Sequence, residues 1–285
     1  MGHKSIYRSH LGEEKVTKKY AELLRHWPVE KQADFVETPQ GKTHVIVSGS
    51  GDNPPLVLLH GACDNSLMWL KQVQSYLHSF QVYVIDIIGE ANPSAQQRPP
   101  LGSGNYVDWL EAILAHYNIQ QVALCGFDFG AWICLRFAAR WPDKITKLAL
   151  LSPSGIVGGK KGLMLKRLLL TLVSGTFGRR WLLSSLLQRN LDTNQQELNA
   201  LIIRHFKPRS WSLPNALKPP LPPLYCPVLL ILGGKDRFYD TDKVLLALAK
   251  QIPQLELILR PKEGHFLEDY TRELDRFLVT EFAPE

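Results

Sequence analysis

One stretch of the sequence decides the fold: Val122-Ala123-Leu124-Cys125-Gly126-Phe127-Asp128-Phe129-Gly130. Its first four residues are an apolar run typical of a buried strand, and the apolar periodicity from Ala131 to Trp141 predicts a helix. Asp128, the central residue of the three between the two glycines, therefore lies on a sharp strand-to-helix turn. Such a turn presents one side chain, here Asp128, at the end of a sheet, where a nucleophile is expected.

Similar apolar runs recur along the chain, separated by longer amphipathic stretches. Because Gly, Pro or Asp residues bound these runs, we interpret them as buried strands of a mostly parallel sheet. Helical patterns between them lie at 106–117, 131–141 and 241–251, and this alternation predicts a doubly wound sheet with ligands at the carboxyl ends of its strands. The other expected strands are Thr43–Val47, Pro55–Leu59, Gln81–Ile85, Leu148–Leu151, Val228–Leu232 and Leu255–Leu259.

The alternation is interrupted between Ser152 and Pro223. This stretch is leucine-rich and basic, has helical periodicity, and closes with a proline-rich turn at 218–223 that forbids a helix. Because an insertion after the sixth strand would lie above the strand ends, we expect a helical cap over the active site. The predicted organisation is one domain, with a core at 1–151 and 224–285 and a cap at 152–223.

Two further strand ends carry polar side chains. Asp236 follows the strand that ends at Leu232, and His265 follows the strand that ends at Leu259. Alone, they would be interpreted as a turn residue and a loop histidine. After the turn at Asp128, their order is that of a nucleophile, an acid and a base. In this triad His265 is the base, and Asp236 fixes its tautomer and stabilises its charged form.

The segment His60-Gly61-Ala62-Cys63 directly follows the strand Pro55–Leu59. A glycine there lets the chain turn, so the N–H of Ala62 can join the N–H of Phe129 as an oxyanion hole. Phe129 begins the predicted helix, where backbone N–H groups carry a partial positive charge. We interpret His60 as a structural loop residue.

With these pieces in place, the chain resembles the α/β-hydrolase superfamily, and in particular its capped bacterial carboxylesterase-like members. The likeness covers almost the whole chain, although the cap resembles the family only in composition and position. It implies an α/β fold with a mostly parallel eight-stranded sheet flanked by helices and a helical cap inserted after strand 6. The matching segments are Thr43–Gly49, Leu58–Ala62, Met68–Trp69, Asp86–Glu90, Leu151–Ser154 and Ile231–Asp236.

Asp128 is a departure from these relatives, which carry serine at the elbow. A serine forms an ester when it attacks a carbonyl, whereas a carboxylate attacking an ester would form a high-energy anhydride. A carboxylate is suited instead to displacement at a saturated carbon, and water activated by His265 would then hydrolyse the resulting alkyl ester. Haloalkane dehalogenases and epoxide hydrolases of this superfamily work in this way.

The donors that such enzymes need for a leaving group are not evident in the sequence. The ring of Phe129 cannot donate a hydrogen bond, and position 63 is Cys63 where those enzymes have proline. No tyrosine occurs between Tyr117 and Tyr225, which weighs against epoxide opening by a cap tyrosine. An indole N–H in the cap could hold a halide, although tryptophan is more often a packing residue. The candidate pocket residues are Trp132, Trp181 and Trp211.

Three functions stay open at this point. The first is a hydrolase of a small organic substrate in which Asp128 attacks carbon and His265 with Asp236 activates water. The second is a weak esterase in which Asp128 acts as a base or positions water. The third is a non-catalytic ligand-binding or regulatory protein that kept the fold and lost the serine nucleophile.

The composition excludes several classes of protein. The net charge of +6 over 285 residues is modest and gathers in no arginine-rich run, so no nucleic-acid partner is expected. The longest apolar run, Leu168–Val173, is far shorter than the roughly 18 residues of a membrane span. The four cysteines have no paired spacing, which favours reduced thiols and a cytoplasmic location. No metal cluster or nucleotide fingerprint is visible, so we expect no cofactor and no metal.

The expected cap is unusually basic. No acidic residue occurs between Asp143 and Asp192, whereas lysines and arginines gather there beside leucines. One interpretation is a lid helix with solvated cations. The alternative is a surface that attracts anionic substrates or weakly contacts anionic lipid. The sequence does not distinguish them, and it predicts no oligomeric state.

Overall fold

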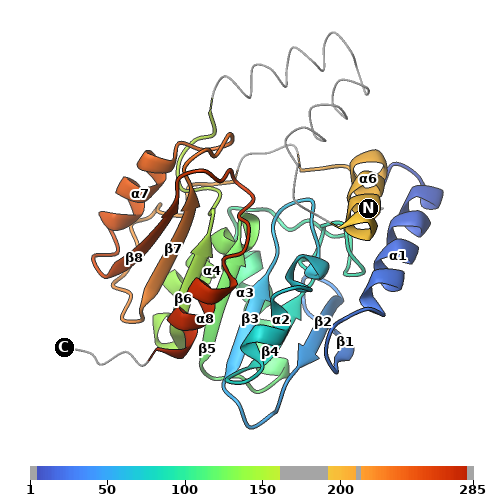
Figure 1. The fold of residues 1–285 in the computed structure, drawn as a ribbon, viewed down its shortest axis with the longest axis horizontal. Helices are drawn as coiled ribbons and strands as arrows, with labels where there is room; N and C mark the ends of the chain where they lie inside the picture. The colour runs from blue at the N-terminus through green and yellow to red at the C-terminus, as the bar shows by residue number, and fades with distance from the viewer. Residues whose placement is uncertain (1–4, 161–191, 210–212, 281–285) are drawn as a thin grey trace.

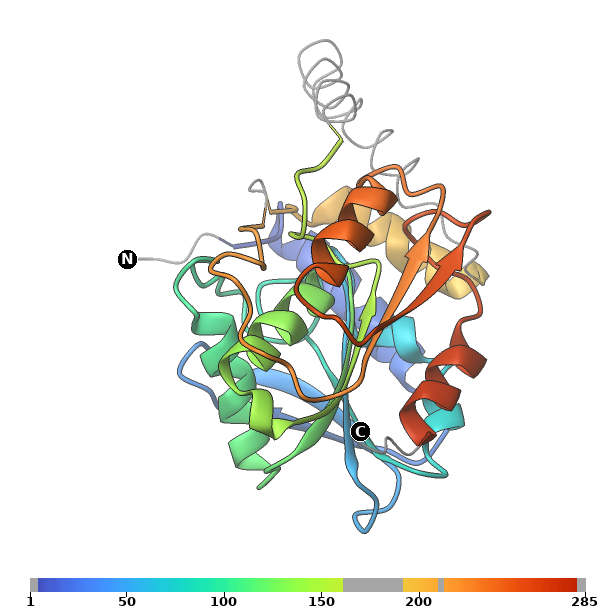
Figure 2. The same cartoon turned by 90° about the vertical axis from the view of Figure 1, so that its left-hand side faces the viewer.

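The computed structural model describes residues 5–160, 192–209 and 213–280 and places one twisted sheet between two layers of helices (Figure 1, Figure 2). Along the chain the eight strands are β1 (Gln32–Val36), β2 (Thr43–Ser48), β3 (Pro55–Leu59), β4 (Gln81–Ile85), β5 (Val122–Phe127), β6 (Ile145–Leu151), β7 (Val228–Gly233) and β8 (Leu255–Arg260). The described helices are α1 (His10–Leu24), η1 (Ser66–Trp69), α2 (Val73–Tyr76), α3 (Asn105–His116), α4 (Phe129–Arg140), η2 (Pro142–Lys144), α6 (Thr193–His205), α7 (Thr241–Ala249) and α8 (Thr271–Val279).

The strand order is β1-β2-β4-β3-β5-β6-β7-β8. β2 runs antiparallel to both β1 and β4, and all other neighbouring pairs are parallel. The expected mostly parallel eight-stranded sheet of the α/β-hydrolase fold is therefore confirmed. The apolar runs predicted seven of its strands. β1 was missed because only Val36 of its five residues is buried, so no apolar run marks it.

Two apolar cores lie on opposite faces of the sheet, because successive strand residues point to opposite sides. In β3, Val57 and Leu59 face the core shared with α3, α4 and α7, whereas Leu56 and Leu58 face the core shared with α1, α2, α6 and α8. This sandwich makes the central strands apolar on both faces. It also gathers the carboxyl ends of the parallel strands at one edge.

β8 differs from its prediction as a buried strand. It lies at the edge of the sheet, and Leu257 and Leu259 are 36% and 47% exposed. The apolar run identified a strand correctly, but an apolar run does not distinguish an edge strand from a central one.

Nearly half of the expected cap, residues 161–191 and 210–212, lies outside the described residues, so the cap and its boundaries stay a prediction. The described part of this insertion includes α6, which packs against α1 (Figure 1). Phe206 pairs with Tyr7 in an isolated antiparallel bridge, and Lys19 forms an ion pair with Glu197. These contacts fix α6 and the residue that follows it against α1 and the N-terminal segment.

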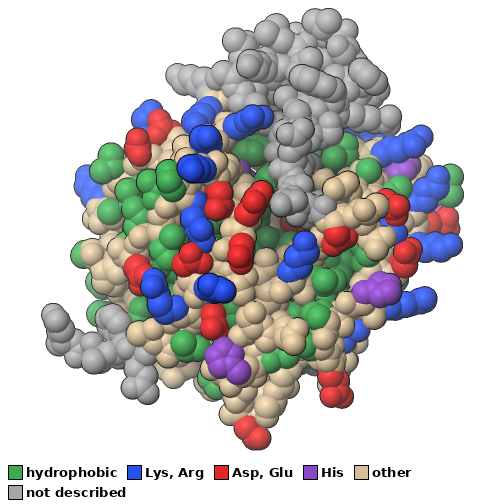
Figure 3. Space-filling view, in the orientation of Figure 1, with side chains coloured by type: hydrophobic (Ala, Val, Ile, Leu, Met, Phe, Trp, Pro, Cys, Tyr) green, Lys and Arg blue, Asp and Glu red, His purple; other side chains and the backbone are tan. Residues whose placement is uncertain are grey.

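Basic and acidic side chains are interspersed on the face drawn in Figure 3. Of the basic stretch, Lys160 is described and donates to the backbone oxygen of Asp236, whereas the cations from Lys161 to Arg189 lie outside the described residues. All four cysteines are described, and each is a free thiol. None of the helices within the described ranges is both long and apolar enough to cross a membrane.

Candidate active site

The turn between β5 and α4 holds Asp128 in a strained backbone conformation, with φ 50° and ψ −108°. A non-glycine residue with positive φ is uncommon, and such strain clusters at functional sites. The flanking glycines permit the turn. A Cβ on Gly126 would lie 2.4 Å from the carbonyl carbon of Gly130, and a Cβ on Gly130 would lie 2.5 Å from the Leu59 oxygen. The geometry is that expected of a nucleophile elbow.

The turn after β3 reaches the same carboxylate. The backbone N–H of Ala62 donates to Oδ2 of Asp128 over 2.9 Å. Gly61 allows this approach, because a Cβ there would lie 2.8 Å from the ring of Phe127. The predicted oxyanion donor Ala62 and the predicted nucleophile are therefore brought together. The second predicted donor, the amide of Phe129, lies at the first residue of α4.

Asp236 and His265 meet beyond the ends of β7 and β8. Nδ1 of His265 lies 2.8 Å from Oδ2 of Asp236, and Nε2 lies 3.5 Å from Oδ1 of Asp128. The other oxygen of Asp236 accepts the backbone N–H groups of Phe238 and Tyr239, which fixes the carboxylate. The three residues predicted as a triad thus lie in one row, and Asp236 and His265 are buried.

The two carboxylates control the charge of His265. Burial of the ring by itself lowers the pKa of His265, but hydrogen bonds and charges from Asp128 and Asp236 outweigh it and raise the pKa to about 9. Burial likewise acts to raise the pKa of Asp236, but the hydrogen bond and charge of His265 outweigh it, so the pKa is lowered. At neutral pH the site therefore holds an imidazolium between two carboxylates.

This charge state predicts a pH-dependent stability. The pKa of His265 is about 9 in the folded protein against 6.5 for the free side chain, so its contribution is complete below pH 6.5 and disappears as the pH rises through 9. We expect the free energy of unfolding to fall by roughly 3 kcal/mol over this range. Urea unfolding at pH 6 and pH 9.5 measures it. His265→Gln is the control and should lose most of this slope; an equal slope in that variant would contradict the assignment.

Two residues that the sequence did not single out as site residues complete the surroundings of Asp128. The hydroxyl of Ser154, in the loop after β6, donates to Oδ1 of Asp128, and the phenol of Tyr239 hydrogen-bonds to Ser154. Burial and the Asp128 charge raise the pKa of Tyr239, so its hydroxyl stays neutral. The sequence features that could have indicated these two residues are a serine just past a strand end and a tyrosine three residues after Asp236.

The predicted pocket tryptophans are placed only in part. The indole N–H of Trp132 donates to the backbone oxygen of Pro214 over 2.8 Å, and its ring stacks on Phe129. Its single donor is therefore used in packing α4 against the segment around Pro214. Trp181 and Trp211 lie outside the described residues.

The side chain of His60 is buried, and both of its ring nitrogens form hydrogen bonds with backbone groups. Its Nδ1–H donates to the Gly61 oxygen, and its Nε2 accepts the N–H of Ile87. A neutral ring satisfies both bonds. His60 thus ties the loop after β3 to the loop after β4, as expected of a structural residue. Across the part of the chain that the structure describes, no three His, Cys, Asp or Glu side chains are grouped so that they could hold a metal ion.

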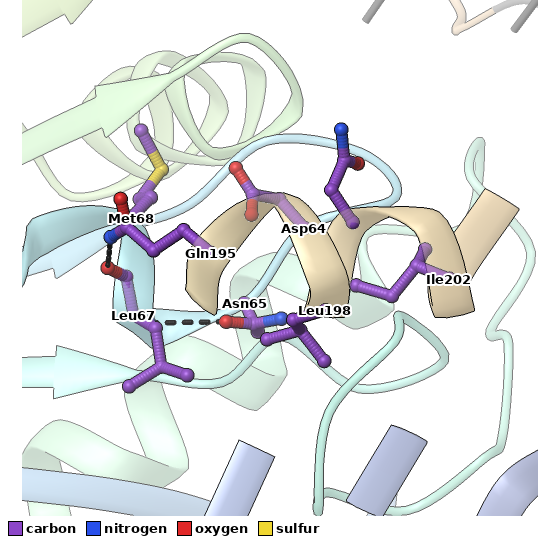
Figure 4. Close-up of a pocket in the computed structure, with 8 residues that line it drawn as sticks. Asp64, Asn65, Leu67, Met68, Gln195, Leu198 and Ile202 are labelled. Carbon is purple, nitrogen blue, oxygen red and sulfur yellow. Dashed lines mark hydrogen bonds between the residues drawn. The ribbon is translucent and has the colours of Figure 1, made fainter. Parts of the chain in front are cut away.

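A small cavity lies between α6 and the loop that continues from the Ala62 turn (Figure 4). Its volume of about 30 Å³ accommodates about two water molecules. An organic substrate needs a pocket of a few hundred Å³, so this cavity is too small to be the substrate pocket. It is lined by Asp64, Asn65, Leu67, Met68, Gln195, Leu198, Asn199 and Ile202.

Comparisons with known proteins agree with this fold. A family model described as "alpha/beta hydrolase fold" matches residues 54–167. The uncharacterized carboxylesterase nap of Bacillus subtilis is 29% identical over 265 residues, which cover 87% of this chain and 85% of the relative. A haloalkane dehalogenase of Mycolicibacterium paratuberculosis is 30% identical over 111 residues, covering 38% of this chain and 37% of that protein.

A solved structure shows the same fold. The carboxylesterase CesB (YbfK) from Bacillus subtilis superposes with a TM-score of 0.79, at 24% sequence identity, over 94% of this chain and 99% of that one. At this identity the likeness concerns the fold alone.

Proposed function

Because this chain belongs to the α/β-hydrolase superfamily, we propose that it is a hydrolase of a small organic substrate in which Asp128 attacks a saturated carbon. The bond forms between that carbon and Oδ1 of Asp128, and the leaving group departs with the electron pair. Water activated by His265 then adds to Cγ of the resulting ester. The product alcohol leaves with Oδ1, and the oxygen from water stays in the carboxylate.

The observation that carries this proposal is the different surrounding of the two Asp128 oxygens. Oδ2 accepts the Ala62 amide, whereas Oδ1 faces Nε2 of His265. If Oδ1 becomes the ester oxygen, Oδ2 is the carbonyl oxygen that turns negative when water adds. The Ala62 amide would then stabilise the transition state without any rearrangement.

The charge of His265 fits the same order of steps. In the free protein the carboxylates of Asp128 and Asp236 both stabilise the protonated form of His265, and its pKa is raised to about 9. An alkyl ester on Asp128 is neutral, so one of the two carboxylate charges disappears and the pKa of His265 falls. The first step would therefore convert the histidine from an imidazolium into the base that the second step needs.

A second candidate function is favoured by the relatives named as carboxylesterases. In that function, Asp128 would act as a base or position water while an ester carbonyl occupies the oxyanion hole. Two features of the site weigh against it. The Ala62 amide already donates to Oδ2 of Asp128, so it is not free for an ester carbonyl oxygen, and His265 is protonated at neutral pH. A haloalkane dehalogenase among the relatives instead favours attack at a carbon bonded to halogen.

A single turnover in heavy-oxygen water tests the proposal. Incubating excess protein with 1-bromohexane should place one heavy oxygen in the carboxylate of Asp128. Peptide mass spectrometry of residues around 122–136 measures the label. Protein incubated in heavy-oxygen water without substrate is the control. Product formed without label in Asp128 would contradict nucleophilic attack by this residue.

A further inference from the structure

A second buried carboxylate lies behind the Ala62 turn. Glu90, in the loop after β4, has no exposed surface, and its Oε2 accepts the backbone N–H of Cys63 over 2.8 Å. Cys63 directly follows Ala62 and has a φ of 60°, in the left-handed region. The bond to Glu90 therefore holds the residue next to the oxyanion donor in a conformation that it would rarely adopt unaided.

Arg209 neutralises this carboxylate from the segment that follows α6. Its Nε donates to Oε1 of Glu90 over 2.9 Å, and the side chain is 11% exposed. Its guanidinium also hydrogen-bonds to the phenol of Tyr106 and lies over the ring of Phe129, 5.2 Å from the ring centroid. One ion pair thus contacts two elements of the site. It contacts the Ala62 turn through Cys63, and it contacts α4 through its first residue, Phe129.

The packing around the pair leaves little freedom. Gly89 has a φ of 74°, and a Cβ there would lie 2.5 Å from Cγ of Arg98 and 3.1 Å from Nη2 of Arg209. Arg98 donates to the oxygens of both Gly89 and Lys207 over 2.8 and 2.7 Å. The loop after β4 and the segment 206–209 are therefore joined around the carboxylate of Glu90.

Stability alone does not account for this arrangement. Removing two charges from water costs about as much as their attraction returns, so buried ion pairs seldom stabilise a fold more than apolar residues of the same size. Their charged hydrogen bonds are, however, short and directional, and they fix geometry. The fixed groups here are the amide of Cys63 and the ring of Phe129.

We propose that Glu90 and Arg209 are positioning residues for the oxyanion hole, and that they make the Ala62 turn dependent on the segment 206–209. Without this pair, the turn relaxes and the Ala62 amide loses its alignment with Oδ2 of Asp128. The part of this inference that concerns the oxyanion rests on the proposed function. The part that concerns the turn does not.

Hydrogen exchange tests the turn without any substrate. In Glu90→Ala, the amides of Ala62 and Cys63 should exchange about tenfold faster or more, because each depends on a bond that the pair maintains. Glu90→Gln keeps an acceptor for Cys63 and should lie between Glu90→Ala and the parent. Glu197→Gln is the matched control, since it removes an ion pair that joins α6 to α1 away from the site. Amides of β5 report any global loss of stability.

The decay of the covalent intermediate tests the oxyanion part. A preformed alkyl ester on Asp128 should hydrolyse about 10- to 100-fold more slowly in Glu90→Ala, because an oxyanion donor is displaced. Alkylation itself should change by no more than about threefold, since no oxyanion develops in that step. Rapid quenching and intact mass spectrometry resolve the two rates. A variant that is merely less stable would lose both rates together.

The outcomes separate the two proposals. Unchanged exchange at Ala62 and Cys63 would overturn the positioning role. Faster exchange with an unchanged rate of ester hydrolysis would also overturn it. If no variant ever carries an ester on Asp128, the proposed function fails, and the exchange measurement alone decides whether the pair positions the turn. The double variant Glu90→Leu, Arg209→Met removes both charges of the pair, and it serves where a single variant does not fold.

Discussion

His265→Gln is expected to abolish turnover and to leave an alkyl ester on Asp128. Attack by the carboxylate needs no base, so the first step still occurs. Hydrolysis of the ester does need one, because water must lose a proton as it adds to Cγ, and a glutamine amide cannot accept it. The rate of hydrolysis should fall on the order of 10³-fold or more. Intact mass spectrometry after incubation with 1-bromohexane should show one added hexyl group.

The peptide that contains Asp128 must carry that group. Asp128→Asn in the same background is the control, since an amide is a poor nucleophile and no adduct should form. Glutamine at 265 preserves a polar side chain next to Asp236, so the fold should be retained, and thermal unfolding checks this. An esterase activity that His265→Gln abolishes, with no adduct at any time, would instead favour the second candidate function.

The elbow could be predicted because its constraints are local. Two glycines around one polar residue, between an apolar run and a helical pattern, determine the turn over nine residues. The proximity of Asp236 and His265 then follows from topology, because parallel strands bring their carboxyl ends to one edge of the sheet. The 2.8 Å contact between these side chains agrees with that prediction.

The rest of the site could not be predicted because it depends on long-range packing. Ser154 follows β6 and hydrogen-bonds to Asp128, which follows the neighbouring strand β5. Tyr239 follows β7 and hydrogen-bonds to Ser154. Glu90 and Arg209 are 119 positions apart in the sequence and meet only in the folded protein. No periodicity or spacing links such residues. Each would have been interpreted as a solvated surface charge or a turn residue.

The same limit applies to the edges of the sheet. β1 contains one buried residue and carried no apolar signal, whereas β8 carried a strong signal and has two exposed leucines. An apolar run indicates that a segment favours a strand conformation and burial in a core. It does not report how many neighbours the strand will have, because that depends on the position of every other strand.

Asp128→Ser is expected to turn the protein into an esterase. The serine would occupy the strained elbow opposite the Ala62 amide, which is then free to bind the carbonyl oxygen of an ester. Removing the carboxylate also removes one of the two charges that raise the pKa of His265 to about 9. The pKa should fall, so His265 becomes a base near neutral pH.

Hydrolysis of p-nitrophenyl butyrate at pH 7.5 should rise on the order of 100-fold over the parent, with the rate increasing through the lowered pKa of His265. Asp128→Ala is the matched control, because it lowers the pKa of His265 equally but supplies no nucleophile. If Asp128→Ser folds and stays as inactive as Asp128→Ala, the surrounding groups are not arranged for hydrolysis. That result would favour a ligand-binding protein. A strong gain would mean that Asp128 alone decides which bond this site breaks.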